Sequence, residues 1–125
     1  MAERSIKIPD ENHPISITPN PKRVLVRFGG EVIADSTRAL SLKEASYPPV
    51  QYVPREDANM NLLERSATQS HCPYKGDASY FSIVAGGHRA ADAVWSYETP
   101  HAAVAGIKEY LAFYPDRVDG IEERD

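Results

Sequence analysis

Cysteine is nearly absent from this sequence, which holds a single one, Cys72, among 125 residues. One cysteine cannot form an intramolecular disulfide, and the paired Cys-x-x-Cys knuckles of a structural zinc site are missing. We therefore predict a reducing, cytoplasmic compartment, no metal site and no cofactor.

Long apolar segments are lacking as well. No stretch approaches the roughly 20 apolar residues that are needed to cross a bilayer. The opening sequence, Met-Ala-Glu-Arg-Ser-Ile-Lys-Ile-Pro-Asp, has none of the apolar core of a secretory signal. We expect neither a membrane partner nor a secretory leader.

The sequence also lacks an excess of positive charge. The formal net charge is −4, and Lys and Arg are scattered among acidic residues. A nucleic-acid binder needs clustered cations to displace counterions from phosphates, so no nucleic-acid partner is predicted. Gly29-Gly30 and Gly86-Gly87 lack the Lys-Ser/Thr of a phosphate loop and the spacing of a dinucleotide fold.

The sequence does contain many short β patterns. Two hairpins are predicted, over 23–35 and 80–95, because apolar runs flank Gly29-Gly30 and Gly86-Gly87 and primed turns need positive φ. An Ala-Asp pair follows each Gly-Gly at the same spacing. Both an ancient duplication and convergence of two similar turns remain open.

The remaining elements are shorter. Residues 40–44 and 50–53 alternate as strands, 55–63 suit one or two helical turns, and 62–66 suit a strand as an alternative. One helix is predicted near the C-terminus, starting at Thr99-Pro100, because Thr is a good N-cap and Pro suits the first helical position. Its buried face would contain Val104, Ile107 and Leu111.

These patterns predict a mostly β fold (α+β by count) organised as one domain. Residues 1–22 read as an extended N-terminal arm rather than a strand, because four prolines interrupt them. Residues 23–119 form the single β-rich domain. Residues 120–125 are predicted to be a solvated acidic tail.

The stretch from Ser70 to Asp77 has the densest reactive chemistry. Cys72 lies beside His71 and three residues before Lys75, and nearby positive charge lowers a thiol pKa and makes the nucleophilic thiolate available. Consecutive strand residues point to opposite faces, so His71 could activate Cys72 only in a turn. The alternative is a buried, unreactive cysteine in a structural loop.

Aromatic and charged residues cluster in three segments and indicate a ligand site. Aromatic walls with one Arg and one Lys suit a small planar or anionic molecule. The alternative is core packing and internal ion pairs. The candidate ligand-binding residues are Tyr47, Tyr52, Arg55, Glu56, His71, Tyr74, Lys75, Trp95 and Tyr97.

Four segments of the chain closely resemble the domain-of-unknown-function family 427: Tyr-Pro-Pro-Val-Gln-Tyr-Val-Pro-Arg-Glu-Asp (47–57), His-Cys-Pro-Tyr-Lys-Gly-Asp-Ala-Ser-Tyr (71–80), Ala-Val-Trp-Ser-Tyr (93–97) and Phe-Tyr-Pro-Asp-Arg-Val-Asp (113–119). The resemblance implies an Mss4-like, β-tent-like fold of two small antiparallel sheets leaning together. It does not carry zinc over, since the knuckles are missing. A nucleotidyltransferase label is used for the family, but the chain lacks the Asp-x-Asp pair that such chemistry needs.

The leading functional hypothesis is a small-molecule-binding domain with a pocket between the sheets. Arg55 and Lys75 would hold an anionic group, and Trp95 and Tyr97 would stack on the ligand. One alternative is an enzyme with Cys72 as nucleophile and His71 or Lys75 lowering its pKa. Another is a non-catalytic interaction module or homodimer, since a β domain has sheet edges.

Overall fold

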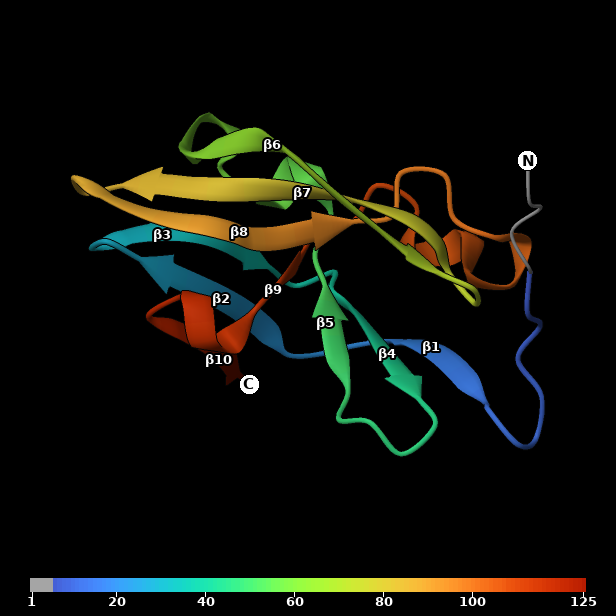
Figure 1. Cartoon of the computed structure of the whole chain (residues 1–125). Helices are drawn as coiled ribbons and strands as arrows, with labels where there is room; N and C mark the ends of the chain where they lie inside the picture. Colours follow the sequence, from blue (N-terminus) through green and yellow to red (C-terminus); the bar gives the residue numbers. More distant parts are fainter. Residues whose placement is uncertain (1–5) are drawn as a thin grey trace.

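The structure, a computed structural model, describes residues 6–125, which form three antiparallel sheets (Figure 1). The strands are β1 (Ile15–Pro19), β2 (Arg23–Phe28), β3 (Glu31–Ser36), β4 (Leu40–Glu44), β5 (Val50–Tyr52), β6 (Leu63–Cys72), β7 (Gly76–Ala85), β8 (His88–Ser96), β9 (Ala112–Phe113) and β10 (Gly120–Arg124). Four short 3-10 helices connect them: η1 (Arg55–Asp57), η2 (Met60–Leu62), η3 (Ala102–Ile107) and η4 (Pro115–Arg117).

The mostly β prediction is confirmed, whereas the prediction of two sheets is wrong. The sheet orders are β1-β4-β5, β10-β2-β3 and β6-β7-β8-β9. Because β4 pairs with β1 and β5 and not with β3, the strands of the first half divide between two sheets. The likeness to the β-tent group stays a prediction.

The four-stranded sheet lies against both smaller sheets, and a separate core fills each contact (Figure 1). The first core joins valines and isoleucines of β2 and β3 to one half of β7 and β8. The second core joins β4 and β5 to the other half of the long sheet and to η3, through Leu42, Tyr52, Ala78, Tyr97, Val104, Ile107 and Ala112. The second core positions the site described below.

Both predicted Gly-Gly hairpins are confirmed, and their turns pack directly on each other. Gly29 and Gly86 adopt φ of 62° and 59°, a region that is costly for residues with a Cβ. An ideal Cβ on Gly86 would lie 1.9 Å from the Gly29 carbonyl oxygen, which leaves no room for a side chain. The two hairpins are therefore joined backbone to backbone at their tips.

The predicted helix from Thr99 is wrong. The chain forms only the 3-10 helix η3, which is kinked at Val104 (φ −124°, ψ 26°), and no helix among the described residues reaches seven residues. Val104 and Ile107 are both buried, as predicted, because a 3-10 turn also places residues i and i+3 on one side. Leu111 is buried by a different route: its backbone pairs with that of Val53 (N···O 2.8 Å in both directions).

The predicted arm and tail both contain strands. Within the arm, Ile15–Pro19 forms β1 and pairs with β4, because Pro14 and Pro19 lie at its ends and leave the ladder intact; residues 1–5 of the arm lie outside the described residues. In place of a solvated tail, Gly120–Arg124 forms β10 and pairs with β2, with Ile121 packed on the first core.

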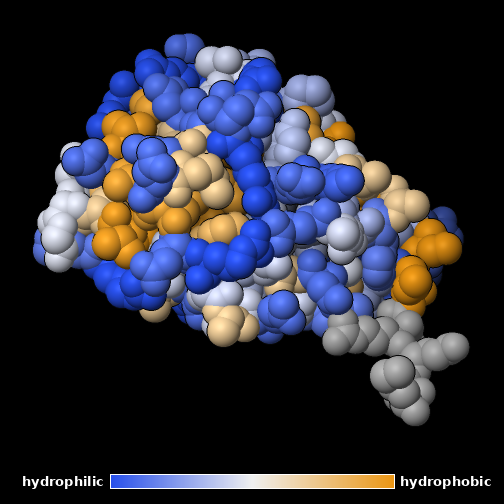
Figure 2. All heavy atoms as spheres, turned by 90° about the horizontal axis from the view of Figure 1, so that it is seen from above, coloured by the Kyte–Doolittle hydropathy of each residue, from blue (hydrophilic) through white to orange (hydrophobic). Residues whose placement is uncertain are grey.

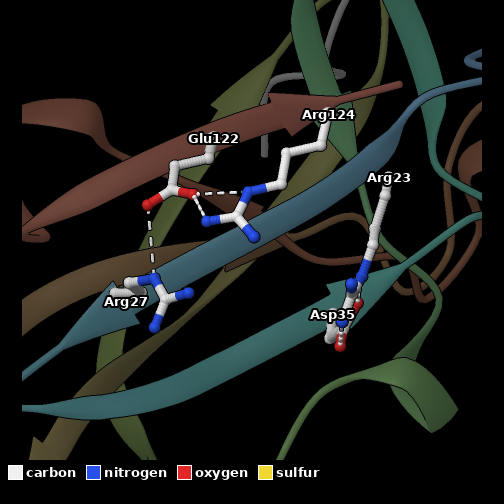
Figure 3. A network of polar contacts seen from close by, with 5 residues as sticks. All are labelled: Arg23, Arg27, Asp35, Glu122 and Arg124. Carbon is white, nitrogen blue, oxygen red and sulfur yellow. Dashed lines mark hydrogen bonds and ion pairs between the residues drawn. The ribbon is translucent and has the colours of Figure 1, made fainter.

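Charged side chains line the outer face of the β10-β2-β3 sheet (Figure 3). Glu122 accepts hydrogen bonds from Arg27 (3.2 Å) and Arg124 (2.6 Å), and Arg23 donates to Asp35 (2.6 Å). Arg23 and Asp35 are 48% and 41% exposed, so their pair is a surface pair. Glu122, predicted to belong to a solvated tail, is thus on the outer face of an edge strand.

The rest of the surface is mixed. Figure 2 shows hydrophilic side chains over most of the face seen from above, with hydrophobic ones gathered in separate areas. The large hydrophobic residues that are exposed come from several segments: Ile6, Ile8, Val32, Tyr47 and Val84. Among residues 6–125, no helix has the length and apolar character of a membrane span. The predicted homodimer is not tested by this surface and stays a prediction.

Candidate functional site

A cavity of about 200 Å³ opens at the second core, and aromatic residues form most of its wall. We call it the aromatic cavity; its lining residues are Leu42, Glu44, Tyr47, Pro48, Val50, Tyr52, Lys75, Tyr80, Trp95, Tyr97 and Tyr114. Five of the predicted ligand-binding residues are among them: Tyr47, Tyr52, Lys75, Trp95 and Tyr97. The structure therefore brings together residues that lie up to fifty positions apart in the sequence.

An ion pair between Lys75 and Glu44 forms the floor of the aromatic cavity. Lys75 belongs to the tight turn between β6 and β7, where its amide donates to the Cys72 carbonyl (3.2 Å) and its carbonyl accepts from His101 (3.0 Å). Glu44 ends β4, on the same face as the buried Leu42. The two side chains are only 11% and 15% exposed.

A second layer of contacts holds Glu44 from behind. The His13 Nε2–H donates to Glu44 Oε2 (2.8 Å), and the His13 ring stacks on Tyr74 with centroids 4.0 Å apart. Burial raises the pKa of Glu44, but hydrogen bonds from Lys75 and His13 outweigh it and leave the pKa below its ordinary value. Tyr74, a predicted binding residue, thus contacts the site only through His13.

Hydrogen bonds and ring contacts order the aromatic wall. Trp95 Nε1–H donates to the Tyr52 hydroxyl (3.3 Å), and the Trp95 ring lies 4.5 Å from that of Tyr114, centroid to centroid. Tyr80 and Tyr114 place their hydroxyl oxygens 3.4 Å apart. Burial raises the pKa of Tyr52 and Tyr97, and it raises that of Tyr114 to about 12. The wall therefore offers protonated hydroxyl groups at neutral pH.

A second cavity of about 270 Å³ lies beside the first and is mostly apolar. Val50 and Trp95 line both cavities. The other residues of this apolar cavity are Val24, Val26, Pro49, Gln51, Val53, Phe113, Pro115, Ile121 and Glu123. Trp95 is thus a wall between a polar, aromatic space and an apolar one.

Arg55 lies away from the aromatic cavity. Its guanidinium donates to Ser96 Oγ (3.1 Å), to Glu98 (2.9 Å) and to the Glu109 carbonyl (2.7 Å). Ser96 alternates with Trp95 and Tyr97, so it points to the opposite face of the chain. The predicted anion clamp of Arg55 with Lys75 is therefore not assembled, because each cation already has its own carboxylate.

Glu98 and Glu56 complete this second polar region. Glu98 also accepts two hydrogen bonds from Arg65 (2.8 and 2.9 Å). The hydrogen bonds from Arg65 lower the pKa of Glu98 more than partial burial raises it. With further hydrogen bonds from Ser79 and Arg55, the pKa falls to about 2. Glu56, a predicted ligand contact, is exposed and pairs with Arg38 at 3.3 Å.

The segment with His71 and Cys72 is a strand end and not a turn. His71 Nδ1 lies 2.7 Å from Asp77 Oδ1 across the β6–β7 hairpin, and the two residues are register partners. Cys72, the next residue of β6, is partly buried and packs against the second core. Since consecutive strand residues point to opposite faces, the condition for activation of Cys72 by His71 is not met.

Sequence reasoning missed three of the lining residues that carry a polar group, Glu44, Tyr80 and Tyr114. Glu44 had a usable signal, since it continues the Leu40, Leu42 alternation and a carboxylate in a buried stripe is unusual. Tyr80 could have been found from the hairpin, because it pairs with Trp95 across β7 and β8. Tyr114 had no local signal, because its place depends on β9 joining the sheet.

Metal chemistry has no cluster to support it in the described part of the chain. Within residues 6–125, no three His, Cys, Asp or Glu side chains are grouped to hold an ion. The polar groups of the aromatic cavity are instead one ammonium, one carboxylate and several hydroxyls.

Comparison with known proteins identifies a family but no activity. No curated protein matches the chain. A family described as a domain of unknown function (DUF427) matches residues 16–124, a range that runs from β1 to β10 and includes the strands of the predicted arm and tail. The resemblance seen in the sequence is therefore confirmed, and the chain belongs to the DUF427 family of unknown function.

Proposed function

We propose that this protein binds a small molecule in the aromatic cavity. The observation that carries the proposal is the Lys75–Glu44 pair, nearly buried at the floor of a space walled by aromatic rings from distant segments. Ligand sites are concave and largely apolar, with a few placed polar groups. A buried ion pair contributes little to stability after its desolvation, so a role in recognition accounts for its position better than a role in folding.

The alternative of plain core packing accounts less well for the same residues. Aromatic rings that only stabilise a core fill the space between them, since interiors are close-packed, whereas these rings surround about 200 Å³. Tyr97 is 7% exposed, and its hydroxyl makes no side-chain hydrogen bond with another residue of the range 6–125 although it is not sealed from solvent. A ligand in the cavity could take the place of solvent as the partner of this hydroxyl.

Native mass spectrometry of freshly purified protein is the first test. A native mass that exceeds the denatured mass by a defined increment would reveal a retained ligand, and a multiple of the chain mass would reveal the homodimer alternative. Weakly bound molecules need a second test, because they dissociate during purification.

Trp95 makes that second test direct, because it is the only tryptophan and it lines the cavity. We expect aromatic fragments to shift the single indole N–H signal in a ¹⁵N spectrum. Val50→Phe should fill the space and abolish the shifts, whereas Ile121→Phe, which narrows only the apolar cavity, should leave them unchanged. Shifts that are equal in both variants would place the binding elsewhere and refute the proposal.

A further inference from the structure

The charges on the cavity floor restrict the class of molecule that can bind, provided that the proposed function holds. Lys75 and Glu44 place one positive and one negative charge side by side, 11% and 15% exposed. A ligand with a net charge would have to separate this pair and leave one member unpaired in a nearly buried position. The floor therefore disfavours both carboxylate and ammonium ligands.

Both members of the pair keep hydrogen-bonding capacity for a neutral ligand. The ammonium of Lys75 has three N–H donors, and Glu44 takes one of them. Each oxygen of Glu44 has one partner among residues 6–125, Lys75 or His13, and each can accept another bond. The floor thus presents a donor and an acceptor next to each other.

Tyr97 extends the donor side of the floor. The Lys75 ammonium lies 5.9 Å from the centre of its ring, and Tyr97 lines the same cavity. A group that accepts from Lys75 or Tyr97 through one atom and donates to Glu44 through the next would satisfy all three. A primary carboxamide has this arrangement, because its C=O and NH₂ are adjacent.

The wall and the volume restrict the rest of the ligand. Trp95, Tyr80 and Tyr114 present ring faces and edges, which favour a flat, apolar partner. A volume of about 200 Å³ is below the roughly 300 Å³ at the lower end of common ligand sites. We infer that the aromatic cavity selects a neutral, single-ring aromatic carboxamide, with the amide on the Lys75–Glu44 pair and the ring against Trp95.

Three probes of one shape test the inference: benzamide, benzoate and benzylamine. Each would be titrated into ¹⁵N-labelled protein at about pH 8, where an ordinary imidazole is neutral, with the Trp95 indole signal as the readout. We expect benzamide to bind at least about tenfold more tightly than either charged probe. Tyr97→Phe should weaken benzamide about fivefold, as expected for one lost hydrogen bond.

Charge variants distinguish recognition by the pair from simple ring burial. Glu44→Gln leaves an unpaired ammonium, so the preference should move from benzamide to benzoate. Lys75→Met leaves an unpaired carboxylate, so the preference should move to benzylamine. Lys108→Met, at an exposed residue that lines neither cavity, should keep the wild-type order. The backbone amide pattern of each variant reports whether it has folded.

Each outcome separates the inference from the proposed function. If benzoate or benzylamine binds the wild type as tightly as benzamide, the inference is wrong and the binding function stands. The same holds if none of the three binds but other aromatic fragments shift Trp95. If no fragment shifts Trp95 at all, both are wrong.

Discussion

The two Gly-Gly hairpins begin alike and end differently. Gly29-Gly30 and Gly86-Gly87 form turns with the same pattern of positive φ, and each hairpin has one register shift. The first hairpin stops after six-residue strands, whereas β7 and β8 are ten and nine residues long. The extra length carries the second hairpin beyond the first core, and there it holds Tyr80 and Trp95.

The difference in length means that one half of the second hairpin stabilises the fold and the other half lines the candidate site. The shared half of each hairpin packs valine, isoleucine and alanine into the first core and joins the other hairpin at the turn. The unshared half of the second hairpin carries part of the aromatic wall, and the turn that precedes it, between β6 and β7, carries Lys75. Changes at the turns should therefore affect folding, and changes in the unshared half of the second hairpin should affect the cavity first.

The largest effect is expected where the two turns meet. Gly86→Ala would force a Cβ to within 1.9 Å of the Gly29 oxygen at a φ of 59°, and we expect a loss of more than about 3 kcal/mol of unfolding free energy. Gly87→Ala is the matched control: its φ is 77° but no atom lies within 4 Å, so it should cost about 1 kcal/mol. Urea titrations measure both, and equal losses would contradict the backbone contact.

The next effect concerns the cavity floor. Lys75→Met leaves Glu44 ionised and nearly buried with only His13 as a partner, and we expect a loss of about 3 kcal/mol. Adding Glu44→Gln to this variant should recover part of the loss, because the unpaired charge is removed. Thermal and urea melts of the single and double variants provide the measurement; a double variant that is less stable than the single one would argue against pairing.

Glu98, two residues after the end of β8, anchors the extended end of the second hairpin through Arg55 and Arg65. The pKa of Glu98 is lowered from 4.5 to about 2 in the folded protein. The ionised carboxylate therefore stabilises the fold fully above the pKa of the unfolded chain, and this stabilisation is lost as pH falls toward about 2. Glu98→Gln should lower the free energy of unfolding by about 1–2 kcal/mol at neutral pH, after allowance for solvent screening. Wild type and variant should converge in stability between pH 4.5 and about 2.

Glu64→Gln is the control for that pH profile. Glu64 pairs with Arg89 at 3.2 Å, and both side chains are more than half exposed. Its substitution should change stability little at any pH. If the Glu98 and Glu64 variants gave the same profile, the network around Glu98 would have no special role.

The smallest effect on stability is expected for substitutions at the equivalent aspartates of the two hairpins. Asp35 lies within β3, whereas Asp92 has a φ of 50° at the bulge of β8. Glycine weakens a regular strand but relieves a positive φ. Asp35→Gly should lower Tm by about 3–5 °C, while Asp92→Gly should change it by less than about 2 °C. Calorimetry of both variants gives the comparison, and a larger drop for Asp92→Gly would contradict it.

Local signals were enough to predict the hairpins but not the sheet partners. The Gly-Gly turns have a chemical requirement for positive φ that can be read from the sequence, and both hairpins are confirmed. The helix prediction went wrong because the Thr99-Pro100 cap is a local preference, whereas backbone pairing of Leu111 with Val53 is a long-range one. The same applies to β1 and β10, whose strands depend on partners elsewhere in the chain.

For the candidate site, residue types were predicted better than residue geometry. Tyr47, Tyr52, Lys75, Trp95 and Tyr97 line one cavity, and their role in binding stays a prediction. The partner of Lys75 could not be predicted, because Glu44 belongs to a strand of a different sheet. Which cation meets which carboxylate is decided by sheet packing and not by spacing.

The pairing of β10 with β2 has a consequence for synthesis of the chain. β2 is made early, at Arg23–Phe28, but its neighbour on one side is Gly120–Arg124. During translation the first hairpin can form as soon as it leaves the ribosome, yet one edge of β2 stays open until residue 124 has emerged. An open strand edge invites pairing with other nascent chains. Arg23 and Arg27 of β2 and Asp35 of β3 already lie on the outer face of this sheet before β10 is made, and they keep the waiting edge charged.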